Sequence, residues 1–199
     1  MAERTSARAD ALRNREAVLA AADELFARSE SPRGVSMDDV AAAAGVGKGT
    51  LFRRFGDRTG LIQAVFASRI EPLRAAVETG PAPLGPATPP RERVPAVLDA
   101  LLKFKLDNRH LSLALEEAGS GSPYQAAHYA WWHDILRDAL SRLPGTDDNA
   151  DFTAHALLAA TRADLVEHLA GAEGMSPRRM RNRLAAFVDT VLGQVSRLV

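Results

Sequence analysis

The spacing of hydrophobic residues predicts helices along almost the whole chain. Apolar side chains recur every three to four residues, and the periodic stretches are separated by residues that favour turns and caps, mainly Gly, Pro, Ser and Asp. We find no strand pattern and no internal repeat. We therefore predict an all-α fold of about nine helices, at residues 14–28, 36–45, 48–55, 57–77, 94–108, 111–118, 122–143, 150–170 and 181–198.

One stretch, residues 36–55, has the pattern of two short helices joined by a tight turn. Ser36 and Asp39 match a Ser-x-x-Asp capping box, in which each residue bonds a free backbone N–H of the other at the start of a helix. Gly45 follows the last apolar residue of that helix and suits the left-handed conformation that ends helices. Two short helices joined in this way are typical of a helix-turn-helix, whose second helix enters the major groove of DNA.

The second helix of the pair has a basic outer face. Leu51 and Phe55 lie on one side at helical spacing, so the polar side chains turn away from them. Between residues 47 and 58 the basic residues outnumber the acidic ones, although the net charge of the whole chain is zero. The residues expected to contact DNA are Gly47, Lys48, Thr50, Phe52, Arg53 and Arg54.

Spacing alone leaves a second interpretation open, a structural hairpin with a solvated basic face. The run V-S-M-D-D-V-A-A-A-A-G-V-G-K-G-T-L-F-R-R-F-G-D-R-T-G-L, with the helix before it, closely resembles the DNA-binding domain of the TetR family over about residues 14–65. Family members often carry Ser, Tyr and His where this chain has Gly47, Phe52 and Arg54. The resemblance implies a three-helix DNA-binding domain and a C-terminal helical domain that binds a ligand and dimerises.

Composition and this resemblance together suggest the domain boundaries. Residues 1–12 are polar and are predicted to form a disordered N-terminal arm, and residues 13–66 are predicted to form the DNA-binding domain. Residues 67–199 would form the ligand-binding and dimerisation domain, in which the Pro-rich segment 80–95 is predicted to be a long loop. Pro72 predicts a kink or an end in its helix.

The helix predicted at residues 122–143 is the most aromatic part of the chain. Its aromatic side chains could fill the core or form the wall of a ligand pocket, and both interpretations stay open. The resemblance favours a pocket, because TetR-family proteins typically enclose an inducer within the C-terminal domain. The candidate pocket residues are Phe66, Phe104, Tyr124, His128, Trp131, Trp132, Phe152 and His155.

The two last predicted helices have wide apolar faces. These faces could be buried within one subunit, or they could pair with the same helices of a second copy in a four-helix bundle. DNA recognition favours a homodimer, because one DNA-binding domain reads only a few base pairs, whereas two domains can read a near-palindromic operator. The candidate interface residues are Phe152, Leu158, Leu165, Leu184, Phe187, Val188, Val191 and Val195.

The composition argues against several other kinds of chemistry. The absence of cysteine excludes disulfides and thiolate sites, and none of the five histidines has His-x-x-x-His or His-Glu-x-x-His spacing. We therefore expect no metal, no cofactor and no covalent catalysis. Lys48 lacks the following Ser or Thr and the preceding strand of a phosphate-binding loop. Because the N-terminus does not resemble a signal peptide and no apolar stretch is long enough to span a membrane, we expect a cytoplasmic protein.

These observations predict a ligand-responsive transcriptional regulator. We expect a repressor that binds double-stranded operator DNA as a homodimer and is released by a small, largely apolar effector. The alternative is a helical small-molecule-binding protein or enzyme whose N-terminal hairpin is only structural. Salt-dependent binding to a specific DNA site distinguishes the two.

Overall fold

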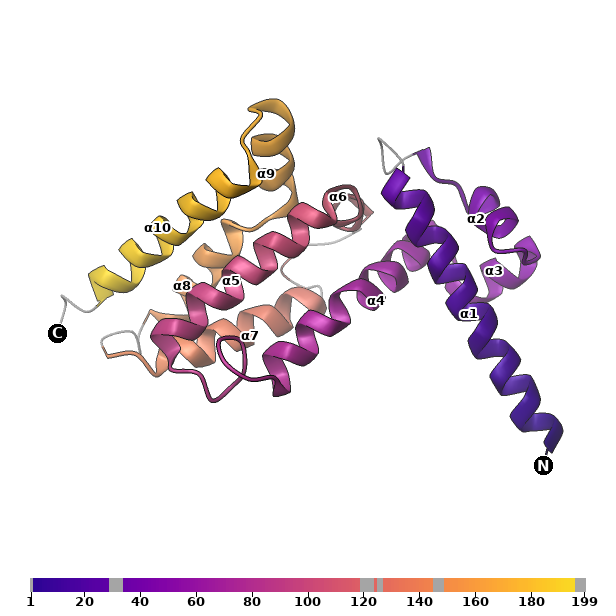
Figure 1. Ribbon diagram of the computed structural model, residues 1–199, viewed down its shortest axis with the longest axis horizontal. Helices are drawn as coiled ribbons and strands as arrows, with labels where there is room; N and C mark the ends of the chain where they lie inside the picture. Colours follow the sequence, from indigo (N-terminus) through magenta and orange to yellow (C-terminus); the bar gives the residue numbers. More distant parts are fainter. Residues whose placement is uncertain (1, 29–33, 119–123, 125–126, 145–148, 196–199) are drawn as a thin grey trace. The chain divides into compact units, whose positions relative to one another are not determined.

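The computed structural model describes residues 2–28, 34–118, 124, 127–144 and 149–195. Every regular element in these ranges is a helix, which confirms the all-α prediction (Figure 1). None of the described helices is long and apolar enough to cross a membrane. The elements are α1 (Ala2–Arg28), α2 (Met37–Ala43), α3 (Lys48–Phe55), α4 (Arg58–Thr79), α5 (Pro90–Asp107), α6 (Arg109–Ala118), α7 (Ala127–Ser141), α8 (Ala150–Ala159), α9 (Ala163–Glu167), a π-helical turn (His168–Ala172) and α10 (Pro177–Val195).

The chain forms two compact units. Unit 1 contains the chain up to Arg69 together with most of α6, and unit 2 contains the remainder. The division falls inside α4, which is one continuous helix across Pro72, where we predicted a kink or an end. Proline removes one backbone hydrogen bond there. Ile70 and Val77, on either side of Pro72, are buried and hold this part of the helix in unit 2.

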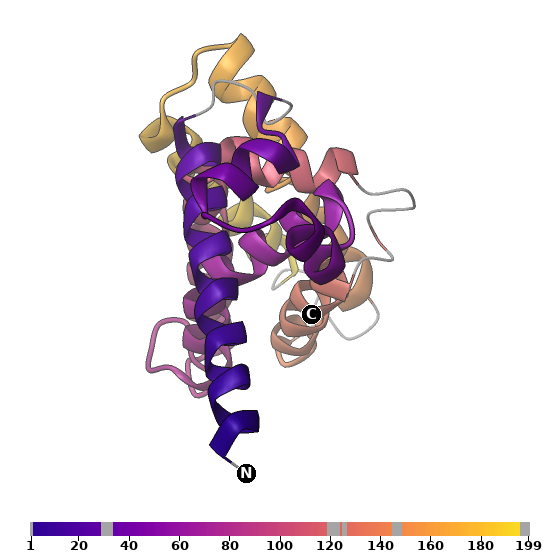
Figure 2. The same cartoon turned by 90° about the vertical axis from the view of Figure 1, so that its right-hand side faces the viewer.

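α1 is longer than the predicted first helix. It begins at Ala2, so the prediction of a disordered arm at residues 1–12 is wrong from Ala2 onward. This segment lacks Gly and Pro and is rich in Ala and Arg, which have high helix propensities. Val18, Ala22 and Phe26 form its buried stripe. In Figures 1 and 2, α2 lies beside the C-terminal half of α1, and the first turns of α1 extend beyond it.

The Pro-rich segment is shorter as a loop than predicted. The expectation of a loop over residues 80–95 is wrong from Pro90, where α5 begins, because proline at a first helical position lacks only an N–H that would be unpaired anyway. Arg93 of α5 is buried, and it donates to the backbone carbonyls of Val77 at 2.9 Å and Leu84 at 3.0 Å. A buried guanidinium therefore fixes both the end of α4 and the loop.

The single helix predicted at residues 150–170 is divided into α8, α9 and the π-helical turn. The Thr161 hydroxyl donates to the Leu158 carbonyl at 2.9 Å, and Arg162 has an extended backbone with ψ 144°. The Arg162 guanidinium also binds the Asp164 carboxylate at 2.8 Å. These local side-chain bonds compete with the helical hydrogen bonds and explain the break.

α10 packs one stripe of its surface into unit 2. It begins at Pro177, four residues before the predicted start at residue 181, and the Ser176 hydroxyl accepts the Arg179 N–H at 3.3 Å. Arg181 binds the Asp99 carboxylate of α5 through two hydrogen bonds of 2.6 and 2.7 Å. The buried side chains recur every four residues, at Met180, Leu184, Val188 and Leu192.

Candidate nucleic-acid interface

The predicted capping box begins α2. The Ser36 hydroxyl accepts the Asp39 N–H at 3.1 Å, and the Asp39 carboxylate accepts the Ser36 N–H at 3.0 Å. These bonds to Ser36 lower the pKa of Asp39, because they favour the charged carboxylate. Val40 and Ala41 are buried on the opposite side of the helix. The prediction of a capped helix start is confirmed.

Gly45 makes the turn between α2 and α3. Its φ is +65°, in the left-handed region that other residues rarely adopt, and this confirms its predicted role as a helix-ending glycine. The turn lets the Val46 N–H donate to the Ala41 carbonyl at 3.0 Å, which closes the end of α2. Gly47 then precedes α3 as its N-cap without any side-chain hydrogen bond. The start of α3 therefore carries no side-chain bulk at its cap.

α3 has one buried side and one accessible side. Leu51 is 1% exposed and Phe55 is 8% exposed, as the periodicity predicted. The residues predicted to contact DNA are all accessible: Gly47, Lys48, Phe52 and Arg53 are exposed, and Thr50 and Arg54 are half-buried. A basic helix thus presents its polar side chains to solvent while two apolar residues anchor it to unit 1.

Comparison with known proteins identifies this arrangement. The model of the tetR family of bacterial regulatory proteins matches residues 18–65, from the middle of α1 into α4. An HTH-type transcriptional regulator of Staphylococcus aureus is 31% identical over 140 residues, which cover 66% of this chain and 69% of the relative. The chain belongs to the TetR family. It is a DNA-binding transcriptional regulator and not an enzyme.

Solved structures of other TetR-family regulators share its fold. A TetR transcriptional regulator from Rhodococcus sp. RHA1 superposes with a TM-score of 0.64 at 23% identity, over 92% of this chain and 97% of that chain. NalD, the secondary repressor of the MexAB-OprM multidrug efflux pump in Pseudomonas aeruginosa, superposes with a TM-score of 0.57 at 17% identity, over 90% and 95% of the two chains. At these identities the similarity shows the fold alone.

In this TetR-family regulator, Lys48 forms an ion pair that the sequence analysis did not predict. Its Nζ lies 2.5 Å from Oδ2 of Asp38, so the pair joins the first turns of α2 and α3. The two side chains are 64% and 58% exposed. Exposed ion pairs contribute little to stability, so a phosphate can replace the Asp38 carboxylate at low cost. The two residues come together only because the turn at Gly45 reverses the chain.

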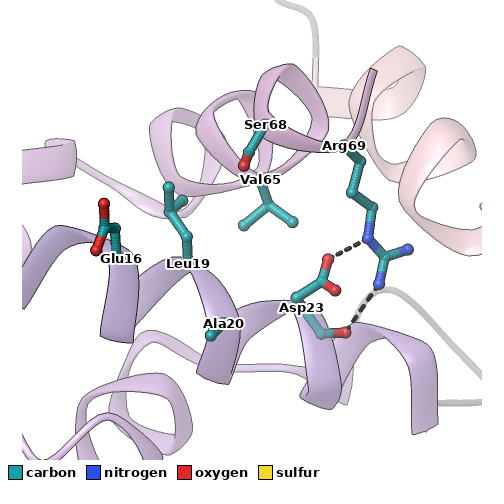
Figure 3. Close-up of a pocket in the computed structure, with 7 residues that line it drawn as sticks. All are labelled: Glu16, Leu19, Ala20, Asp23, Val65, Ser68 and Arg69. Atoms are coloured by element: carbon teal, nitrogen blue, oxygen red, sulfur yellow. Dashed lines mark hydrogen bonds and ion pairs between the residues drawn. The ribbon is translucent and has the colours of Figure 1, made fainter. Parts of the chain in front are cut away.

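Contacts between α1 and α4 support the helix-turn-helix. Figure 3 shows Arg69 of α4 bonded to Asp23 of α1, through both the carboxylate and the backbone carbonyl, the second bond at 3.2 Å. The pair borders a small pocket whose other lining residues are Glu16, Leu19, Ala20, Val65 and Ser68. Arg58, one of the basic residues between 47 and 58, donates to the Val35 carbonyl at 3.0 Å. Part of the predicted positive charge therefore stabilises unit 1 itself.

The candidate pocket residues are divided between the two units. Phe66 is buried in unit 1, and the other seven belong to unit 2. The Trp131 indole N–H donates to Glu78 at 3.0 Å, and the guanidinium of Arg74 lies 4.5 Å from the centre of its ring. Within the seven, Trp132 is buried, Phe104, Trp131 and His155 are half-buried, and Tyr124, His128 and Phe152 are exposed.

Two of these residues belong to a separate aromatic cluster. Tyr124 lies edge-on to Tyr129 at 5.2 Å and to His155 at 6.1 Å between ring centroids. The His155 ring stacks on that of His133 at 4.0 Å. His133 and its neighbour Asp151 were not among the predicted site residues, because no motif spacing connects them in the sequence.

The candidate dimer residues divide into buried and exposed sets. Leu158, Leu184 and Val188 are buried within unit 2, so their assignment to a dimer face is corrected: they fill the core of a single chain. Phe152, Leu165 and Phe187 are 74%, 38% and 42% exposed, and Val191 is half-buried. Val195 is the last residue of α10. The exposed apolar residues lie on α8, α9 and α10.

Proposed function

We propose that this TetR-family regulator is a repressor that binds a near-palindromic operator as a homodimer and leaves it when a small, largely apolar effector binds. The observation that carries the proposal is the accessible basic face of α3 above the buried Leu51 and Phe55. NalD, which shares the fold, is a repressor.

Gly47 and five accessible residues of α3 contact the DNA in this proposal. Gly47 allows close approach of the backbone to a phosphate, since no side chain stands at the helix start. Lys48 exchanges Asp38 for a phosphate or a guanine edge, and Thr50 contacts a phosphate or a base edge. Arg53 and Arg54 bind the phosphate backbone of the DNA. Phe52, which is 46% exposed, offers an apolar contact to a thymine methyl group.

Dimer formation rests on the exposed apolar side chains of unit 2. Phe152, Leu165 and Phe187 are large apolar residues that remain accessible in the single chain. An isologous interface that buries them would give the dimer two copies of α3, one for each half-site of a near-palindromic operator. The effector then acts by population shift. It binds better to the conformer in which the spacing of the two DNA-binding domains does not match the operator half-sites, and so it lowers the affinity of the dimer for DNA.

Lys48→Ala and Thr50→Ala test the placement of the reading helix. Each should weaken binding to an operator fragment by about 1–3 kcal/mol, because each removes a contact made by the first turn of α3. Lys48→Ala should also reduce the slope of log affinity against log salt by about one. Fluorescence anisotropy at two salt concentrations measures both quantities, on DNA fragments that the protein protects in genomic footprinting.

Lys103→Ala is the matched control for Lys48→Ala. Lys103 lies on α5, is 59% exposed and pairs with Asp107 at 2.5 Å, so it reproduces the environment of Lys48 away from α3. It should leave DNA affinity unchanged. Equal affinities of the wild type and both α3 variants, with dimers intact in sedimentation, would disprove this assignment of the reading helix.

A further inference from the structure

Two pairs of polar residues face each other from α7 and α8. Tyr129 and His133 are four residues apart on α7, and Asp151 and His155 are four residues apart on α8, so each pair projects from one face of its helix. The two helices pack together in unit 2. This packing brings two imidazoles, one carboxylate and one phenol into contact.

The two histidines direct Nε2 toward the same carboxylate. Nε2 of His133 lies 3.4 Å from Oδ1 of Asp151, and Nε2 of His155 lies 3.9 Å from Oδ2 of the same residue. One ligand atom from each of the three residues lies within 4.8 Å of the others. Two imidazole nitrogens and a carboxylate oxygen are a ligand set typical of zinc and related divalent transition metals.

The outer ring nitrogens of both histidines have partners of their own. Nδ1 of His155 lies 2.6 Å from the Tyr129 hydroxyl, and Nδ1 of His133 lies 3.9 Å from a carboxylate oxygen of Asp134. The Tyr129 hydroxyl oxygen can accept an N–H from Nδ1 of His155. Nε2 of His133 also lies 3.3 Å from the Asp151 backbone carbonyl, a contact that a metal ion would replace. With the proton on Nδ1, the Nε2 lone pair of each histidine would face the ion, which is the usual arrangement of metal-binding histidines.

We propose that His133, Asp151 and His155 bind one divalent transition-metal ion, with Tyr129 positioning His155. Zinc coordination at about 2.0–2.2 Å requires the three ligands to converge. This is feasible because the Asp151 and His155 side chains are 68% and 40% exposed, whereas His133 is only 10% exposed and serves as the fixed point. Water from the exposed side completes the coordination.

The ion would join α7 to α8. The bridge is independent of α3 and goes beyond the proposed function, because it assigns unit 2 an inorganic ligand in addition to the apolar effector. Tyr124, which lies edge-on to both Tyr129 and His155, flanks the site on its aromatic side. Phe152, an exposed apolar residue of the candidate dimer face, follows Asp151 in α8.

Cobalt(II) titration of the full-length, metal-free protein without a histidine tag tests the proposal. Binding should produce the visible absorption of Co²⁺ in a nitrogen and oxygen site, saturate at one ion per chain and be reversed by Zn²⁺. Asp151→Asn and His155→Gln, both at accessible positions, should each lower the affinity more than tenfold. Tyr129→Phe should lower it about 10- to 100-fold, because it removes the hydroxyl that orients the His155 ring.

His168→Gln is the matched control. His168 belongs to the same unit and lies 3.3 Å from Glu173, so it has an acidic partner but no part in the cluster. It should bind Co²⁺ like the wild type. The proposal is overturned if excess Co²⁺ or Zn²⁺ produces neither absorption nor a rise in melting temperature. It is also overturned if Asp151→Asn and His155→Gln bind as tightly as the wild type while circular dichroism shows them folded.

Discussion

The helix-turn-helix and the histidine cluster are assembled in opposite ways. The bonds that begin α2 join Ser36 to Asp39, three residues apart, and α3 follows after one turn. In the cluster, His133 and Asp151 are eighteen residues apart and lie on different helices. A site built from consecutive residues carries its pattern in the sequence, whereas a site assembled by helix packing has no spacing signature.

The two regions also differ in what holds their functional side chains. Lys48 and Arg53 lie on the exposed side of a short helix, whose position depends on Leu51 and Phe55 beneath it. The ring of His133 is nearly buried and stacks on that of His155, and the Tyr129 ring lies near both. The first region presents side chains to a long, charged partner, whereas the second holds one fixed ligand, His133, toward which Asp151 and His155 can move.

Truncation of one core leucine in each region should have the largest effect. Leu51→Ala and Leu157→Ala remove side chains that are 1% and 0% exposed, and each should lower the free energy of unfolding by about 2–5 kcal/mol. Leu51→Ala should abolish DNA binding and leave the Co²⁺ absorption intact. Leu157→Ala, on α8, should weaken that absorption.

Urea unfolding followed by circular dichroism gives the free energies of unfolding. Fluorescence anisotropy measures DNA binding, and Co²⁺ absorption measures metal binding at the histidine cluster. Loss of the Co²⁺ absorption in Leu51→Ala, at a temperature where unit 2 is still helical, would show that the two regions are not independent. The helix-turn-helix and the histidine cluster could then no longer be treated as separate regions.

A pair of glycine substitutions should have intermediate effects of opposite sign. Gly45 has φ +65°, so Gly45→Ala places a side chain in the left-handed region and should destabilise the protein by about 1–2 kcal/mol. Gly49 lies inside α3 with open space around an added Cβ, so Gly49→Ala should stabilise it by about 0.5–1 kcal/mol. Thermal unfolding measures both. Equal shifts in the same direction would contradict the turn geometry described for Gly45.

The smallest expected effect is the pH dependence that Asp39 gives to unit 1. The bonds from Ser36 lower the folded-state pKa of this carboxyl below its ordinary value of 3.8. Its contribution to stability is therefore fully present above about pH 4 and is lost as the pH falls through the folded-state pKa. Asp39→Asn should make unfolding less sensitive to pH in this acidic range. Melting temperatures measured from neutral to acidic pH provide the test, and parallel curves for the two proteins would contradict it.

Proline patterns show where local signals misled the prediction. The six prolines between residues 80 and 95 suggested one long loop, yet α5 begins at Pro90 and α4 runs through Pro72. Pro90, at the first helical position, costs no hydrogen bond, whereas Pro72 costs one inside α4, where the buried neighbours Ile70 and Val77 compensate for it. The decisive contact is that of Arg93 with the Val77 carbonyl, which depends on two segments meeting in space.

The sequence by itself determined the all-α class, the cap at Ser36, the left-handed turn at Gly45 and the two anchors of α3. These features depend on residues within one or two helical turns of each other, and such residues interact in the same way wherever the helix is placed. Only the tertiary structure paired Lys48 with Asp38, buried Leu184 and Val188 inside a single chain, and brought His133 to Asp151. The physical reason is that a helical pattern shows which face is apolar or polar, whereas packing decides what that face meets.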